Sequence, residues 1–133
     1  MLGGRGDSGP RASVPGEIVV DHSTSHEFYD FEAKYIESDT ARLDIPADLP
    51  QAVAERVRDY AVRAFESIGG EGIARVDVFV TPDEQVVLNE INTMPGFTPI
   101  SMYPKMWEAS GVPYPELIDE LIQLALERRT GLR

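Results

Sequence analysis

Apolar residues recur every three or four positions between Val53 and Ile68, which is the spacing of one face of an α-helix. Most of the residues between them are charged or polar and suit a solvent-facing side. Asp48 is a suitable N-cap, Pro50 fits the first turn, and Gly69–Gly70 ends the apolar pattern. The pattern therefore predicts an amphipathic helix whose buried stripe is Val53, Val57, Ala61, Ala64 and Ile68.

Two further helices are predicted in the last third of the chain. The first runs from about Ser101 to Ala109 and stops at Gly111. The second begins near Pro115 and ends at Arg128–Arg129, where the helix dipole favours cations. Its apolar positions are Leu117, Ile118, Leu121, Leu124 and Ala125.

Between the first helix and the last two, polarity alternates with the two-residue period of β-strands. Ile73–Val80 and Gln85–Asn92 have this alternation, and Thr81–Glu84 has the composition of a turn. They predict an antiparallel hairpin, and Glu17–Val20 is predicted as a further short strand. One face of the hairpin is apolar and ready to pack on a helix: Val76, Val78, Val80, Val87 and Ile91. The expected fold class is α+β, an antiparallel sheet packed with helices.

The opposite face of the hairpin carries Arg75, Asp77, Glu90 and Asn92. A turn centred between Asp83 and Glu84 would place Asp77 opposite Glu90 and Arg75 opposite Asn92. A turn centred one residue earlier would place Arg75 opposite Glu90 instead. Either register keeps all four side chains on one face, unless a bulge intervenes.

Two carboxylates and an amide oxygen are a donor set that suits a hard divalent cation such as Mg²⁺. A glutamate can bridge two such ions in phosphoryl transfer, and a neighbouring arginine can stabilise charge that develops on the transferred group. The alternative is a solvated sheet face with a cross-strand Arg–Glu pair of little energetic weight. Spacing alone favours this alternative.

Composition narrows the function classes. The chain has 133 residues, a length typical of one domain, and no cysteine, which excludes disulfides, thiolate metal sites and a cysteine nucleophile. Twelve basic against 23 acidic residues give a net charge of −11, which disfavours binding to nucleic acids and anionic membranes. No apolar run could span a membrane, so a cytoplasmic location is expected. An acidic chain that handles an anionic substrate would need a cation.

Two segments show no periodicity. Residues 1–16 contain five of the eleven glycines and are interpreted as a flexible or non-native arm that precedes one domain over residues 17–133. Residues 21–47 are polar with scattered aromatics, and a loop of that length is typical of lids or disordered segments.

The loop after the hairpin adds a second set of candidate groups. Gly96 would allow backbone amides to approach a ligand closely. Ser101 lies at a predicted helix N-terminus, where its hydroxyl and the free amides favour a carboxylate or phosphate. An ordinary N-cap is the alternative for Ser101, and composition alone favours it.

These segments together resemble a known family. ARVDVFV followed by VVLNEINTMPGFTPISMYPKMWEASG is similar to the C-terminal part of D-alanine–D-alanine ligases, which belong to the ATP-grasp superfamily. HEFYDFEAKY resembles the ω-loop of that family, which usually reads FYDYEAKY, so Phe31 replaces a tyrosine. ASVPGEIV matches the segment that leads into the loop. The resemblance covers about residues 12–126 and implies an ATP-grasp C-terminal subdomain with a long ω-loop lid.

The resemblance implies roles on the hairpin. Asp77, Glu90 and Asn92 match the ligands of two Mg²⁺ ions, for which Mn²⁺ can substitute, and Glu90 matches the bridging ligand. Arg75 matches the arginine that stabilises the transferring phosphoryl group and the tetrahedral intermediate. Phe28, Phe79, Asn89 and Glu90 fall where the family binds ATP.

It also implies roles in the loops. Gly96 matches the amide that donates to the oxyanion of the intermediate, and Ser101 with Met102 matches the pair that holds the carboxylate of the second D-alanine. Lys34 and Tyr35 match the ω-loop residues that reach the ATP phosphates and close the site. For Lys34, a surface pair with Glu32 or Glu37 is the alternative.

The implied enzyme is an ATP-dependent ligase that forms D-alanyl-D-alanine through an acyl phosphate for peptidoglycan synthesis, with D-alanine and ATP as partners and a homodimer compatible with the full-length enzyme. The family's glycine-rich phosphate loop and its N-terminal and central regions have no counterpart in these 133 residues, so this chain alone is expected to be nearly inactive. The alternatives are part of a D-alanine–D-lactate ligase, disfavoured by Lys34–Tyr35, and a non-enzymic acidic module that binds divalent cations.

Overall fold

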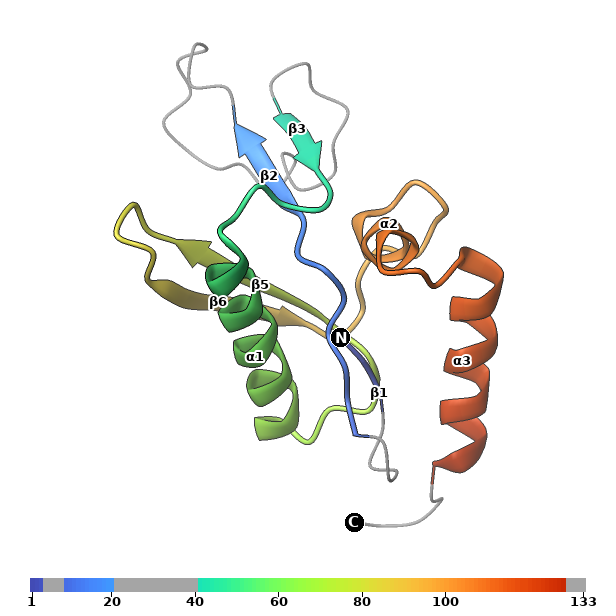
Figure 1. Ribbon diagram of the computed structural model, residues 1–133. Coiled ribbons are helices and arrows are strands. Elements are labelled where there is room, and N and C mark those ends of the chain that lie inside the picture. Colours follow the sequence, from blue (N-terminus) through green and yellow to red (C-terminus); the bar gives the residue numbers. More distant parts are fainter. Residues whose placement is uncertain (4–8, 21–40, 129–133) are drawn as a thin grey trace.

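The computed structural model describes residues 1–3, 9–20 and 41–128 (Figure 1). The strands within these residues form three separate antiparallel pairs. β1 (Leu2–Gly3) pairs with β4 (Gly72–Ile73), β2 (Glu17–Val20) with β3 (Ala41–Asp44), and β5 (Arg75–Val80) with β6 (Val86–Asn92). The helices are α1 (Gln51–Ser67), α2 (Met102–Ala109) and α3 (Tyr114–Glu127). The α+β class is confirmed. None of the described helices is long and apolar enough to cross a membrane.

Helix α1 covers one face of the β5–β6 hairpin. It begins after Pro50, whose extended backbone occupies the N-cap position, so the prediction of Asp48 as N-cap is wrong. The helix ends before Gly69, which has φ +65°, as the sequence predicts. Ile68 is the C-cap and is 51% exposed, because the helix stops before that side chain can turn inward. The buried stripe is Val53, Val57, Ala61, Ala64 and Phe65.

The β5–β6 hairpin contains a register shift. Asp77 pairs with Glu90, but the next residue, Val78, pairs with Leu88, so Asn89 is the extra residue of a bulge. Beyond the bulge Val87 lies opposite Phe79 and is half-exposed. The prediction that Val87 faces the helix is therefore wrong, because one inserted residue moves the following side chains of β6 to the other face.

The first residues of the chain are packed into the core. Met1 and Leu2 are 6% and 1% exposed, and Leu2 of β1 pairs with Ile73 of β4. The N-terminal amino group of Met1 donates to the Ala74 carbonyl at 2.7 Å, and burial lowers the pKa of this group to about 5. The interpretation of residues 1–16 as a flexible arm therefore does not hold for the described part of that segment, because apolar contacts and strand pairing fix it.

Two clusters of buried side chains flank this N-terminal strand. One joins Met1 and Phe65 to Val76 and Ile91 of the hairpin. The other joins Leu2 to α2 and α3 through Tyr103, Trp107, Val112 and Leu117. The Tyr103 hydroxyl donates to the Met1 carbonyl at 2.6 Å, and burial raises the pKa of Tyr103.

The two C-terminal helices lie close to the predicted positions. The apolar residues of α3 are divided between a buried side and an exposed side. Leu117 is fully buried, whereas Ile118 is 37% exposed. Arg128 lies at the C-cap of α3 and pairs with Glu71 at 3.1 Å.

Candidate functional site

Arg75, Asp77, Glu90 and Asn92 lie together on the side of the β5–β6 hairpin away from α1, and we call them the polar quartet. Arg75 is directly opposite Asn92 and Asp77 is directly opposite Glu90, which is the first of the two predicted registers. The bulge follows Asp77 and leaves the quartet aligned. On the other face, Val76 and Ile91 pack against the cluster that contains Phe65. The sheet beneath the quartet is thus held by the core.

Within the quartet, Arg75 and Asp77 form a two-point ion pair. The Arg75 Nε lies 2.7 Å from the Asp77 Oδ1, and the Arg75 Nη2 lies 2.9 Å from the Asp77 Oδ2. The Arg75 and Asp77 side chains are 17% and 24% exposed, so this pair is partly shielded from solvent. The Arg75 Nη2 also lies 3.7 Å from the Glu90 Oε1, so the guanidinium reaches both carboxylates.

Asn92 is oriented by the loop that follows it. The Asn92 Oδ1 accepts a hydrogen bond of 2.9 Å from the Met94 amide. This contact fixes the side-chain amide at the end of β6 and leaves the second lone pair of the oxygen for another partner.

The donor chemistry of the quartet fits a magnesium ion. Two carboxylates and one amide oxygen are too few to enclose an ion, and the described residues contain no group of three His, Cys, Asp or Glu side chains suited to hold one. Mg²⁺ commonly uses one or two carboxylates and fills its octahedron with water and substrate phosphate. Asp77 could serve as a ligand only after Arg75 gives up at least one of its two hydrogen bonds.

An apolar surface adjoins the quartet on the same face. Phe79 follows Asp77 by two residues and is 60% exposed, and Val87 opposite it is 48% exposed. The family resemblance pointed to Phe79, whereas the sequence pattern assigned Val87 to the opposite face, because only the bulge at Asn89 brings Val87 to this one. An exposed aromatic ring beside charged groups suits a ligand with a planar ring and an anionic tail.

The loop before α2 brings Gly96 and Ser101 together. A Cβ atom on Gly96 would lie 3.3 Å from the Ser101 Oγ. Ser101 is the N-cap residue of α2, but its hydroxyl makes no capping hydrogen bond to the helix. It accepts instead from the Thr98 amide at 3.1 Å and lies 2.8 Å from the Thr98 Oγ1. Thr98, which sequence analysis missed, therefore holds the Ser101 hydroxyl, and Met102 begins the helix beside it.

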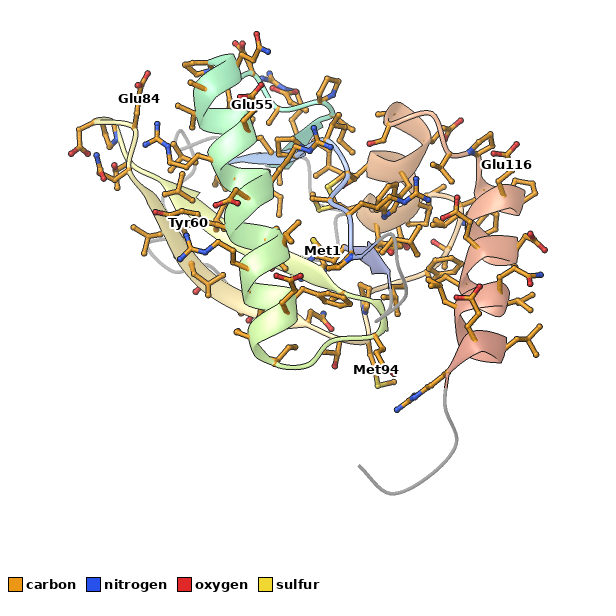
Figure 2. The ribbon with its side chains drawn as sticks, turned by 60° about the horizontal axis from the view of Figure 1, so that its bottom comes forward. Met1, Glu55, Tyr60, Glu84, Met94 and Glu116 are labelled. Atoms are coloured by element: carbon orange, nitrogen blue, oxygen red, sulfur yellow. The ribbon has the colours of Figure 1, made fainter. Side chains whose placement is uncertain are left out.

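Figure 2 shows Met94 in the loop that leaves the hairpin. Met94 is 88% exposed, and Ile100 farther along this loop is 78% exposed. The remaining predicted site residues, Phe28, Lys34 and Tyr35, fall within residues 21–40 and lie outside the described residues.

Comparison with known proteins gives consistent matches. The family described as "D-ala D-ala ligase C-terminus" matches residues 2–123. The D-alanine–D-alanine ligase of Arthrobacter sp. (strain FB24) is 62% identical over 133 residues, which are all of this chain and 35% of that protein. The chain thus spans about a third of the length of the curated relatives it matches.

Two solved structures extend the match to the fold. The D-alanine–D-alanine ligase of Coxiella burnetii superposes with a TM-score of 0.76 and 44% identity, over 96% of this chain and 30% of that one. The ligase of Bacillus anthracis, solved in complex with ATP, has a TM-score of 0.59 and 30% identity, over 64% of this chain and 29% of that one.

Proposed function

We propose, since this chain belongs to the D-alanine–D-alanine ligase family, that it supplies the phosphoryl-transfer and metal-binding part of an enzyme that joins two D-alanine molecules at the expense of ATP. The observation that carries the proposal is the polar quartet, in which two carboxylates, an amide oxygen and a guanidinium share one sheet face above a packed core.

The quartet's residues divide the work by their chemistry. Asp77, Glu90 and Asn92 would hold two Mg²⁺ ions with Glu90 between them, or Mn²⁺ in their place. Bound there, the ions would neutralise the phosphates of ATP, which a chain of net charge −11 would otherwise repel. Arg75 would contact the oxygens of the transferring phosphoryl group and stabilise the charge that develops on them.

The loop residues are proposed to handle the second D-alanine. Ser101 and Met102 would bind its carboxylate at the N-terminus of α2, where unpaired amides favour an anion. The γ-phosphoryl group passes to the carboxylate of the first D-alanine, and the amine of the second attacks that acyl phosphate and displaces phosphate. The Gly96 amide would donate to the oxyanion formed in the attack.

The nucleotide and the lid complete the proposal. Phe79 and Asn89 would line the adenine side of the ATP site together with Phe28. Lys34 and Tyr35 would reach the phosphates from the ω-loop and exclude water, which protects an acyl phosphate from hydrolysis. ATP and D-alanine as substrates favour a cytoplasmic location, and a homodimer of the full-length enzyme is part of the same proposal.

A chimera tests the proposed function. The matching 133 residues of the Arthrobacter ligase are replaced by this chain, and phosphate release from ATP is measured with and without D-alanine. We expect D-alanine-dependent turnover, and we expect Asp77→Asn to reduce it by about 100-fold or more, as loss of a metal ligand should exceed the usual cost of losing an outer-sphere partner. A folded chimera without turnover would contradict the proposal.

Two controls accompany the chimera. Asp44→Asn removes a carboxylate with the same Arg-x-Asp spacing outside the quartet, and it should leave turnover within about two-fold. The isolated 133-residue chain should release almost no phosphate, because it spans only 35% of the relative's length. Robust turnover by the isolated chain would contradict that expectation.

A further inference from the structure

Among the described residues, both proposed carboxylate ligands of the cation pair with a side chain that is itself a cation, Arg75. Both oxygens of Asp77 accept hydrogen bonds from Arg75, at 2.7 and 2.9 Å. The same Arg75 Nη2 lies 3.7 Å from the Glu90 Oε1. One guanidinium therefore reaches the two carboxylates that the proposed function assigns to the metal.

A divalent cation would need the same oxygen lone pairs. A planar guanidinium engages a carboxylate at two points, and each of these charge-assisted hydrogen bonds is about twice as strong as a neutral one. Binding of the ion at Asp77 requires that at least one of these bonds break, and the freed guanidinium would stand beside a second positive charge. The low exposure of Arg75 and Asp77 limits the compensation that water can provide.

We propose that Arg75 is a built-in competitor of the divalent cation: it holds Asp77 in a two-point pair and gives the quartet a lower affinity for the bare ion than its carboxylates alone would have. This inference rests on the proposed function, since it assumes that Asp77 and Glu90 bind the ion. It adds that the two-point geometry of the Arg75 guanidinium, and not its charge alone, lowers the affinity of the quartet for the ion.

The chain contains a matched control. Arg42 and Asp44 on β3 have the same i, i+2 spacing and the same two-point contact, with 2.9 Å from Nε to Oδ1 and 3.0 Å from Nη2 to Oδ2. Glu17 lies opposite Asp44 as Glu90 lies opposite Asp77, but Val19 stands where the quartet has Asn92.

The first experiment measures the affinity of the purified chain for Mn²⁺ by electron paramagnetic resonance of the free ion. The variants are Arg75→Lys, Arg75→Gln and Asp77→Asn, with Arg42→Lys as control, and urea unfolding verifies that each is folded. Lysine keeps the charge but loses the planar fork. We expect Arg75→Lys to bind Mn²⁺ about 3- to 10-fold more tightly, as one charge-assisted hydrogen bond is lost from the competitor. Arg42→Lys should change nothing.

The outcomes separate this inference from the proposed function. If Asp77→Asn weakens Mn²⁺ binding while Arg75→Lys matches the parent chain and only Arg75→Gln is tighter, charge alone acts and the inference is overturned, although the cation site remains. If Asp77→Asn leaves Mn²⁺ binding unchanged, Asp77 is not a ligand, and the cation site of the proposed function is lost as well.

A second measurement uses the unaltered chain and does not depend on the folding of a variant. The Nε–H signals of Arg75 and Arg42 are followed by ¹⁵N NMR during a titration with Mg²⁺. We expect the Arg75 signal to shift and to exchange faster with solvent as the ion displaces it, while the Arg42 signal stays constant. An Arg75 signal that stays constant while Mg²⁺ shifts the Glu90 amide would overturn the inference.

Discussion

The β2–β3 and β5–β6 hairpins carry nearly the same arrangement of charged residues. Each has an arginine and an aspartate two residues apart on one strand, joined by a two-point ion pair. Each has a glutamate directly opposite the aspartate on the partner strand. The residue opposite the arginine differs, because β2 has Val19 there and β6 has Asn92.

The hairpins differ most in what lies beneath them. Arg42 is 71% exposed, whereas Arg75 is 17% exposed. None of the eight residues of β2 and β3 is buried, while α1 packs against both β5 and β6 and Phe65 anchors that contact. An exposed pair of opposite charges contributes little to stability, so the Arg42–Asp44 pair needs no functional explanation. A site that binds an ion also needs a third oxygen donor and a rigid support.

The support beneath the quartet gives the largest expected effect. Phe65 is 1% exposed, and Phe65→Ala should destabilise the chain by about 3–5 kcal/mol because it leaves a cavity between α1 and the hairpin. Leu43→Ala on β3, none of whose four residues is fully buried, should cost about 1 kcal/mol or less. Urea unfolding measures both. Equal losses would show that the two hairpins are equally tied to the core.

In the purified 133-residue chain, acidification should act through the Met1 amine, which lies beside the start of β5 and outside both hairpins. Burial lowers the pKa of the Met1 amine from 8.0 to about 5, so the unfolded chain binds this proton more tightly than the folded chain. Stability should therefore fall as the pH drops from 8 to 5, by up to about 4 kcal/mol. The Met1 amine bonds the carbonyl of Ala74, next to Arg75.

Asp44 should not contribute to the change in stability between pH 8 and 5. Its hydrogen bond from Arg42 holds its pKa below the ordinary value, so the carboxylate stays charged throughout this range. Urea unfolding at several pH values measures the effect. Acetylation of the Met1 amine should remove most of this pH dependence. If the free energy of unfolding changes with pH as steeply after acetylation as before, the dependence comes from other groups.

Removal of one carboxylate from each hairpin shows whether the cation binds at the quartet or at the acidic surface in general. Glu90→Gln should weaken Mn²⁺ binding by about 10-fold or more, as a ligand is lost. Glu17→Gln removes the same charge opposite Asp44 and should weaken it less than about two-fold, through the overall field alone. Mn²⁺ titration of the two variants measures the difference. Equal effects would mean that the acidic chain attracts the ion only diffusely.

The smallest expected effect is on the pKa of Asp44 in the exposed Arg42–Asp44 pair. The hydrogen bond from Arg42 lowers the pKa of Asp44, so Arg42→Gln should raise that pKa toward its ordinary value. The Asp44 carboxyl carbon, followed by NMR during an acid titration, reports the change. An unaltered pKa would show that the pair does not persist in solution, as is common for exposed ion pairs.

Local patterns in the sequence predicted much of the fold and the quartet. The 3.6-residue period placed α1 and α3, and the two-residue period placed Asp77 opposite Glu90 in one of two registers. These features depend on residues close together in the chain. The roles of Ser101, Met102 and the ω-loop residues remain predictions.

Features that depend on distant contacts or on exact loop geometry were not predictable in this way. The bulge at Asn89 moves Val87 to the face of Phe79, and no periodicity signals a single inserted residue. The turn between β5 and β6 contains Glu84, which adopts φ +63° although it is not a glycine. Leu2 pairs with Ile73, some seventy residues away, and is buried in the cluster with Tyr103 and Trp107, contacts that the glycine-rich sequence around it does not signal.

Binding of a divalent cation at the polar quartet can be located by residue-resolved NMR of the ¹⁵N-labelled chain during a Mn²⁺ titration. The ion broadens the amide signals nearest to it first. We predict that Asp77, Glu90 and Asn92 lose intensity before Glu17 and Asp44. Broadening that begins on the β2–β3 hairpin, or that spreads evenly over the acidic surface, would show that the quartet is not the cation site.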